Sequence, residues 1–224
     1  MSGGGPVMDS GFHYCDSLRY LLGEVDRVYA EARAIGSGVP CGLSESREDT
    51  VIATFSFRSG VVGSWSWSQA ARGLPASNIT FYCSEGSITD ISSNPFRIFH
   101  LFERRGEQPP DRENARIVNS EGREISLQEL EDLHLEAIDD SEREFLFPGG
   151  ISDGFAYEIW EFLECIRGNR DRPEVDGWEG LRSLAVCEAV YESAYSGEAV
   201  HVDEVISGDC CAYQEAVNEH WGLV

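Results

Sequence analysis

Four polar side chains near the start of the chain have types and spacings that could serve acid–base chemistry. Asp9 and His13 are four residues apart, and Asp16 and Tyr20 follow at positions that fall on the same side of an α-helix. A carboxylate one helical turn from an imidazole can orient the ring or stabilise its charge while the ring exchanges a proton. The stripe would present ionisable groups to a cleft if its opposite side is packed against other elements.

Each of these residues also has a plainer interpretation. Asp9 and His13 could be solvated surface groups, and Asp16 could contact a substrate or pair with Arg19 on the helix surface. Tyr20 could line the cleft or belong to an interface. A divalent metal on Asp9 and His13 is disfavoured, because the sequence offers no evident third ligand.

The elements that must position this stripe begin with a helix expected from about Pro6 to Leu22. Pro6 would stand in its first turn and Gly23 just past its end, which is the usual way to enter and leave a helix. At 100° per residue the apolar positions gather opposite the polar stripe. They are Val7, Gly11, Tyr14, Leu18, Leu21 and Leu22.

Strand patterns follow the helix without strict alternation of strand and helix. One strand is expected at 25–35 and is followed by a loop at 36–49. A hairpin then joins 51–57 to 61–67, and a second hairpin joins 78–83 to 87–91. A further strand is expected at 97–102, and a last one at 199–205. This order predicts an α+β fold with an open, largely antiparallel sheet and helices packed on one face.

The second half of the chain combines an irregular stretch with two strong helices. Residues 103–147 are charged and read as an insertion, with one short helix opened by the capping box from Ser126 to Glu129. Helices are expected at 155–167 and at 178–196, the latter closed by Gly197. We therefore expect one domain over 1–205 and a tail over 206–224 that adds a short helix.

Charge and cysteine content exclude several partners and compartments. The chain has 40 acidic residues against 17 basic ones, all of them Arg, and a net charge of −23, which disfavours nucleic acid and anionic membranes. No apolar run is long enough to span a membrane. The seven cysteines form no C-x-x-C pair, and no signal peptide is evident, so we expect a cytoplasmic protein.

Two motifs in this order resemble the Gfo/Idh/MocA oxidoreductases. Residues 4–16 are similar to the family's G-G-x-x-x-D-x-G-x-H-x-x-D helix, and residues 179–197 are similar to its closing helix. They read GGPVMDSGFHYCD and EGLRSLAVCEAVYESAYSG. The resemblance covers about 3–101 and 150–205, and it implies the family's C-terminal domain, an α+β domain for substrate binding and oligomerisation.

The resemblance implies a substrate and a role for each residue of the stripe. Asp9 and His13 would be the carboxylate and imidazole at the reacting hydroxyl of a sugar or cyclitol, with Asp16 and Tyr20 as candidate substrate-binding groups. The hydride would pass to NAD(P) held by a Rossmann domain. That domain would be a missing or partner domain, because no strand-linked G-x-G-x-x-G precedes the motif and the chain has no Lys for the family's E-K-P motif. Alone, the chain is expected neither to bind NAD(P) nor to turn over.

Three functions remain open from the sequence. The first is the substrate-binding half of an NAD(P)-dependent sugar or cyclitol oxidoreductase that needs a Rossmann partner chain or a missing domain. The second is a non-catalytic module for sugar binding or dimerisation. Such a module would form a homo-oligomer through the sheet face that carries Phe55, Phe57, Trp65 and Trp67. Alternatively, these aromatic side chains pack under the domain's own helices. The third is a nucleotide-independent lyase or hydrolase on a sugar, with His13 as general base.

Overall fold

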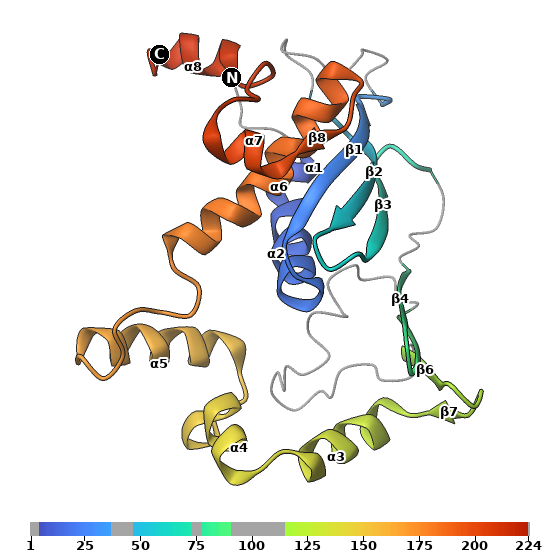
Figure 1. The fold of residues 1–224 in the computed structure, drawn as a ribbon, viewed down its shortest axis with the longest axis vertical. Helices are drawn as coiled ribbons and strands as arrows, with labels where there is room; N and C mark the ends of the chain where they lie inside the picture. Colours follow the sequence, from blue (N-terminus) through green and yellow to red (C-terminus); the bar gives the residue numbers. More distant parts are fainter. Residues whose placement is uncertain (1–4, 37–46, 73–77, 91–114, 224) are drawn as a thin grey trace. The chain divides into compact units, whose positions relative to one another are not determined.

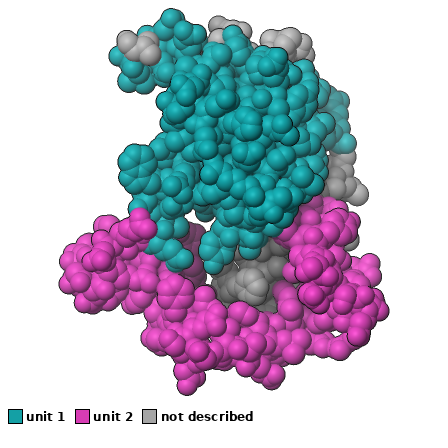
Figure 2. Space-filling model, viewed as in Figure 1, with its two compact units in different colours: residues 1–72, 174–224 teal, residues 73–173 magenta. Residues whose placement is uncertain are grey.

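The computed structural model describes residues 5–36, 47–72, 78–90 and 115–223, and it divides into two compact units. Unit 1 comprises Met1–Arg72 and Glu174–Val224, and unit 2 comprises Gly73–Pro173 (Figure 2). The predicted strand at 97–102 lies outside the described residues, as does most of the predicted loop at 36–49. The predicted α+β class is confirmed, with antiparallel strands in two four-stranded sheets, one in each unit.

Unit 1 is built on a four-stranded antiparallel sheet with the order β3-β2-β1-β8 (Figure 1). Its strands are β1 (Val25–Arg33), β2 (Thr50–Phe57), β3 (Val62–Ser68) and β8 (Val200–His201). The predicted hairpin is confirmed, and its turn needs glycine because Gly60 has a φ of 88°. Alternate residues of β1 and β2 are buried, so this sheet has one covered and one open face.

Three helices cover one face of this sheet, namely α1 (Pro6–Asp9), α2 (Gly11–Leu22) and α6 (Gly177–Ser196). The long helix α6 packs against β1 and α2, and it ends where Gly197 adopts the left-handed conformation, as predicted. Buried side chains from the sheet and these helices form one core. It comprises Val7, Cys15, Val25, Val28, Ala30, Ala32, Val51, Ala53, Phe55, Phe57, Ala185, Val186, Cys187, Ala189, Val190, Tyr191, Val200 and Val202.

The aromatic sheet face packs against the helices of unit 1, which was the second of the two interpretations that the sequence left open. Phe55 and Phe57 are buried in the core. Trp65 and Trp67 lie with their ring centroids 6.0 and 5.7 Å from the ring of Tyr14 on α2. The inward-facing aromatics therefore stabilise the domain itself.

The first helix is interrupted once, where the sequence predicted a continuous helix. Ser10 separates α1 from α2, yet its backbone stays in the right-handed helical region and its N–H donates to the Pro6 carbonyl at 3.0 Å. The apolar side of this segment is buried at Val7, Gly11 and Tyr14, whereas Leu21 is exposed. The apolar side of this helical segment is therefore buried largely as predicted.

The end of the chain differs from the predicted strand at 199–205. Of this segment, only Val200 and His201 form a strand, β8, which pairs with β1, and α7 (Val202–Ser207) follows directly. Asp203 and Glu204 lie in the first turn of α7, where acidic side chains stabilise the helix dipole. The tail adds α8 (Glu215–Trp221), in agreement with the predicted short helix, and the domain boundary at 205 stays a prediction.

The described part of unit 2 contains a smaller antiparallel sheet and three α-helices. Its sheet has the order β4-β5-β6-β7, with β4 (Ile79–Cys83), β5 (Gly86–Asp90), β6 (Ala115–Asn119) and β7 (Glu124–Ile125). The hairpin of β4 and β5 was predicted, whereas β6 and β7 lie in the stretch expected to be an irregular insertion. Gly86 is required there, because a Cβ at this residue would lie 2.1 Å from the Val118 carbonyl oxygen.

The helices of unit 2 are α3 (Leu127–Ala137), α4 (Asp140–Leu146) and α5 (Gly154–Ile166), with a 3₁₀ turn, η3 (Pro148–Gly150), before α5. The predicted capping box is confirmed, because the Ser126 side chain accepts a hydrogen bond from the Glu129 N–H. The helix expected at 155–167 is α5, whereas α4 was not predicted. Among the described helices of both units, none is long and apolar enough to cross a membrane.

Candidate functional site

The polar stripe predicted from the sequence lies on α1 and α2 of unit 1. Asp9 and His13 are exposed, Tyr20 has an exposed fraction of 79%, and Asp16 is half-buried. Because the other side of α2 packs on the core, Asp9, His13 and Tyr20 lie on the exposed side, whereas Asp16 lies at the edge of this surface next to α6. The predicted site residues therefore share one helix surface.

Local contacts at Ser10 and Ser17 hold the helical turn that carries Asp9 and His13. The Ser10 hydroxyl lies 3.2 Å from a carboxylate oxygen of Asp9, and the Ser17 hydroxyl donates to the His13 carbonyl at 2.9 Å. The ring of Phe12 meets the His13 ring edge-on, with 5.9 Å between centroids. An exposed imidazole one turn from a carboxylate can accept and release protons without an opening of the fold.

Asp16 is connected to α6 through Ser183 and not through a salt bridge to Arg19. The Ser183 hydroxyl donates to Asp16 Oδ1 at 2.7 Å, and Arg19 Nη1 donates to the same hydroxyl oxygen at 2.7 Å. Ser183 is fully buried. This relay fixes one carboxylate oxygen of Asp16 against the closing helix.

Arg19 forms its salt bridges with Glu24 and Glu179, each at 2.8 Å. Burial would lower the pKa of the Arg19 guanidinium, but hydrogen bonds to both carboxylates raise it overall, and the hydrogen bond from Arg19 holds the pKa of Glu24 below its usual value. Arg19 is buried and fully charged. The C-terminal part of α2 is therefore joined to α6 by a hydrogen-bonded ion cluster.

A buried carboxylate holds the start of α1. Glu48 is only 3% exposed, and its two carboxylate oxygens accept hydrogen bonds from the backbone N–H of Gly5 at 2.8 Å and of Val7 at 3.0 Å. The Tyr191 hydroxyl on α6 donates to the same carboxylate at 2.8 Å. Burial, and then the charge of Glu48, raise the pKa of Tyr191 above its usual value, so this hydroxyl stays protonated.

Two glycines of the first motif have steric reasons in these contacts. A Cβ on Gly5 would lie 2.4 Å from the Glu48 carbonyl oxygen, and one on Gly11 would lie 2.7 Å from the Trp65 ring. Neither distance is compatible with a larger side chain unless the neighbour moves. The glycines therefore let α1 and α2 approach Glu48 and the sheet.

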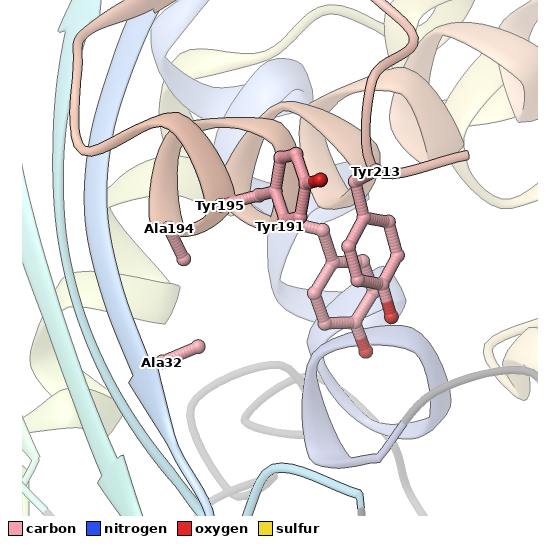
Figure 3. A pocket seen from close by; sticks show the side chains of 5 residues that line it. All are labelled: Ala32, Tyr191, Ala194, Tyr195 and Tyr213. Carbon is pink, nitrogen blue, oxygen red and sulfur yellow. The ribbon is translucent and has the colours of Figure 1, made fainter. Parts of the chain in front are cut away.

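A small pocket of unit 1 lies away from the stripe, between β1, α6 and the tail (Figure 3). The rings of Tyr191 and Tyr213 stack in it with 4.8 Å between centroids. Its volume suits about one water molecule, which is too little for a sugar. It is lined by Ala32, Tyr191, Ala194, Tyr195 and Tyr213.

The described residues do not fit a dinucleotide cofactor. A Rossmann site needs parallel strands joined by a glycine-rich turn to a helix, whereas every described strand pair is antiparallel. The described part of the chain also contains no cluster of three or more His, Cys, Asp or Glu arranged to hold a metal ion. The chemistry available on the stripe is hydrogen bonding and proton transfer.

Comparison with known protein families finds a match over most of this chain. The model of the "Oxidoreductase family, C-terminal alpha/beta domain" matches residues 1–202. The chain therefore belongs to the Gfo/Idh/MocA oxidoreductase family through its C-terminal domain, as the motifs predicted. No curated protein matches it.

The chain spans about half the length of the solved structures named here. The WlbA dehydrogenase from Bordetella pertussis, in complex with NADH and UDP-GlcNAcA, is 24% identical with a TM-score of 0.52, and the match covers 88% of this chain and 45% of that one. The aldose-aldose oxidoreductase from Caulobacter crescentus, complexed with glycerol, is 21% identical with a TM-score of 0.58, covering 89% and 48%. An oxidoreductase domain protein from Kribbella flavida is 18% identical with a TM-score of 0.60, covering 90% and 51%. At these identities the likeness shows the fold.

Sequence reasoning missed the residues that hold the stripe in place. Ser183 and Tyr191 lie within the second motif but had no role assigned, and Glu48 lay in a segment read as a loop. The available signal was burial on the expected core side of the closing helix, where a hydroxyl must find a partner. Nothing in the local sequence around Glu48 marks it as buried.

Proposed function

We propose that this chain binds a sugar or cyclitol and supplies the substrate-binding half of an NAD(P)-dependent oxidoreductase. The observation that carries the proposal is the exposed stripe on a helix that Glu48, Ser183 and Arg19 fix to the core. A fixed helix keeps the reacting groups in place, which is what proton transfer to a bound substrate requires. Membership of the oxidoreductase family supports the reaction class.

Each residue of the stripe has a distinct part in this proposal. The His13 imidazole accepts the proton of the hydroxyl that is oxidised, and the Asp9 carboxylate orients the ring and stabilises its positive charge. Asp16, with one oxygen held by Ser183, offers its other oxygen to a second hydroxyl, and Tyr20 covers the substrate. Relatives solved with UDP-GlcNAcA or glycerol support a polyhydroxylated ligand.

The nicotinamide belongs to another domain in this proposal. A Rossmann domain, on a partner chain or elsewhere in a longer protein, would hold NAD(P) next to the stripe and so supply the hydride acceptor. The solved dehydrogenase with NADH supports this arrangement. By itself this chain binds no dinucleotide and turns over no substrate.

Reconstitution tests the proposed function. The purified chain is mixed with the separately expressed Rossmann domain of a family member, NAD⁺ or NADP⁺, and a panel of aldoses, inositols and UDP-sugars, and nicotinamide reduction is followed. Turnover that falls roughly 10²- to 10⁴-fold in His13→Ala supports the proposal. Ser64→Ala, at an exposed strand position in unit 1, is the matched control. The absence of both complex formation and reduction for every substrate argues against it.

The open face of the unit 1 sheet supports a second role in self-association. Tyr29, Ile52 and Val62 are exposed there, on strands that lie next to one another. We propose that two copies pair through this face, which differs from the aromatic face expected from the sequence. Light scattering tests it, because Ile52→Asp should give monomers while Val175→Asp, also at an exposed site, should not. Monomeric wild type would contradict the pairing.

We also propose a cytoplasmic location. The six described cysteines are free thiols, which is the usual state in a reducing compartment. Fractionation of cells that express the full-length gene product tests this, and recovery outside the cytoplasm would contradict it.

A further inference from the structure

Two buried cysteines meet where α2 packs against α6. Cys15 on α2 is 1% exposed and Cys187 on α6 is 0% exposed, and their sulfur atoms are 3.6 Å apart. Both thiols are unoxidised. Although 172 residues separate them in sequence, they are in van der Waals contact in the fold.

The neighbouring contacts fix this approach. Ser183, one helical turn before Cys187, binds Asp16, the residue next to Cys15, at 2.7 Å. Two consecutive positions of α2 therefore face two successive turns of α6. A disulfide requires the sulfurs to approach to about 2.05 Å, a further closure that rotation of the two side chains can supply when the backbones are already adjacent.

We propose that Cys15 and Cys187 form a reversible disulfide when the protein meets hydrogen peroxide, crosslinking the helix of the polar stripe to the closing helix. Peroxide oxidises one thiol to a sulfenic acid with the release of one water molecule. The second thiol then attacks that sulfur, the S–S bond forms, and the hydroxyl leaves as a second water. Two thiols lose two electrons and two protons in total, and one peroxide is reduced to two waters.

Burial makes this oxidation slow. The adjacent Cys15 thiol and desolvation raise the pKa of Cys187, so little of the reactive thiolate is present in the closed fold. Oxidation therefore requires a local opening between α2 and α6. The exposed Cys83 and Cys211 should react sooner, but Cys83 has no such partner in contact among the described residues and would remain a sulfenic acid or be oxidised further.

The crosslink would close a loop of most of the chain. By the loop-closure argument a disulfide stabilises more as the loop grows, and a loop of this length should raise the thermal unfolding midpoint by roughly 5 °C or more. Reduction with dithiothreitol would reverse the gain. The proposal does not depend on the proposed function, because it concerns only the packing of α2 and α6.

Peptide mapping of the full chain tests the proposal directly. The wild type is treated with hydrogen peroxide, remaining thiols are alkylated, and the protein is digested with trypsin without reduction. Cleavage after Arg19 and Arg182 places Cys15 in 1–19 and Cys187 in 183–224. We expect these peptides to be joined, with fragmentation assigning the bond to Cys187 and not to Cys210 or Cys211. Separate peptides after prolonged oxidation would overturn the proposal.

Variants give a second, independent readout. Cys15→Ala and Cys187→Ala should abolish both the joined peptide and the dithiothreitol-reversible rise in the unfolding midpoint, while Cys83→Ala should keep both. If a buried variant does not fold, the peptide map of the wild type still decides. A reversible rise that persists in Cys15→Ala would assign it to other cysteines and refute this pair.

Discussion

The Ser183 hydroxyl donates a 2.7 Å hydrogen bond to the Asp16 carboxylate and joins the helix of the polar stripe to the closing helix. The same hydroxyl accepts from Arg19, so one buried serine connects a candidate substrate-binding carboxylate with a buried guanidinium. The two sequence motifs of the chain thus meet at a single side chain.

Replacement of Ser183 by Ala should destabilise unit 1. Ala leaves Asp16 and Arg19 each without one hydrogen bond in a buried setting, at a cost of about 1–3 kcal/mol. The free energy of unfolding from urea titration measures this loss. Glu198→Gln, at an exposed position after α6, should change it by less than about 0.5 kcal/mol. Equal effects of the two changes would rule out the relay.

Two helical glycines should respond in opposite directions to substitution by Ala. Gly11→Ala places a Cβ 2.7 Å from the Trp65 ring and should destabilise the fold by about 1–3 kcal/mol. Gly180→Ala meets no atom within 4 Å and should stabilise α6 by about 0.5–1 kcal/mol. Thermal unfolding of both variants measures the contrast, and a stabilising Gly11→Ala would show that α2 does not pack as described.

Glu188 should make stability fall as pH rises. Burial, and then the charge of Glu192, raise the pKa of Glu188 to about 7, and its Oε2 atom is buried with no hydrogen-bond partner among the described residues. The unfolded chain releases this proton near pH 4.5, whereas the folded chain keeps it to about pH 7. The folded state binds more protons in this window, so about 3 kcal/mol is lost across it.

Glu188→Gln removes this titration, and its free energy of unfolding should vary less between pH 4.5 and 8 than that of the wild type. Urea titrations at several pH values measure the two slopes. The exposed Glu198→Gln variant should keep the wild-type slope. If the slope is unchanged in Glu188→Gln, another group is responsible.

Loss of the Glu48 carboxylate should loosen the start of α1. In the wild type the Gly5 and Val7 N–H groups each donate to a different oxygen of Glu48. Glu48→Gln replaces one of these oxygens with an N–H₂ group, which accepts no hydrogen bond, so one N–H loses its partner. This loss should lower the free energy of unfolding by about 2–3 kcal/mol. Amide hydrogen exchange at Val7 should accelerate more than exchange at Val28 in the sheet. Uniform acceleration at both amides would indicate a general loss of stability without a specific role at α1.

The sequence was sufficient for elements whose signals are local. The helix around His13, the hairpin turned at Gly60 and the closing helix ended by Gly197 follow from periodicity, turn residues and caps. The polar stripe was predicted for the same reason. Its exposure follows from the apolar side of the same helix packing on the sheet.

Features that depend on distant residues were not predictable in this way. Strand β6 pairs with β5 across a long segment, and Val200 and His201 pair with β1 before the chain turns into α7. Glu48 is buried because donors arrive from residues 43 and 143 positions away. Such contacts leave no periodic signal, since each partner looks like an ordinary polar residue in its own segment.

The central claim is that a polyhydroxylated ligand contacts the stripe at His13. Carbon–proton NMR spectra of the imidazole rings test this contact, because the chain has only five histidines whose signals can be separated. The spectra are recorded during titration with aldoses, inositols and UDP-sugars. We predict a saturable shift of the His13 signal for at least one ligand, lost in Asp9→Asn and Asp16→Asn, with the signals of His201 and His220 unmoved. No shift at His13 with any ligand class, or equal shifts of all histidines, would contradict the account.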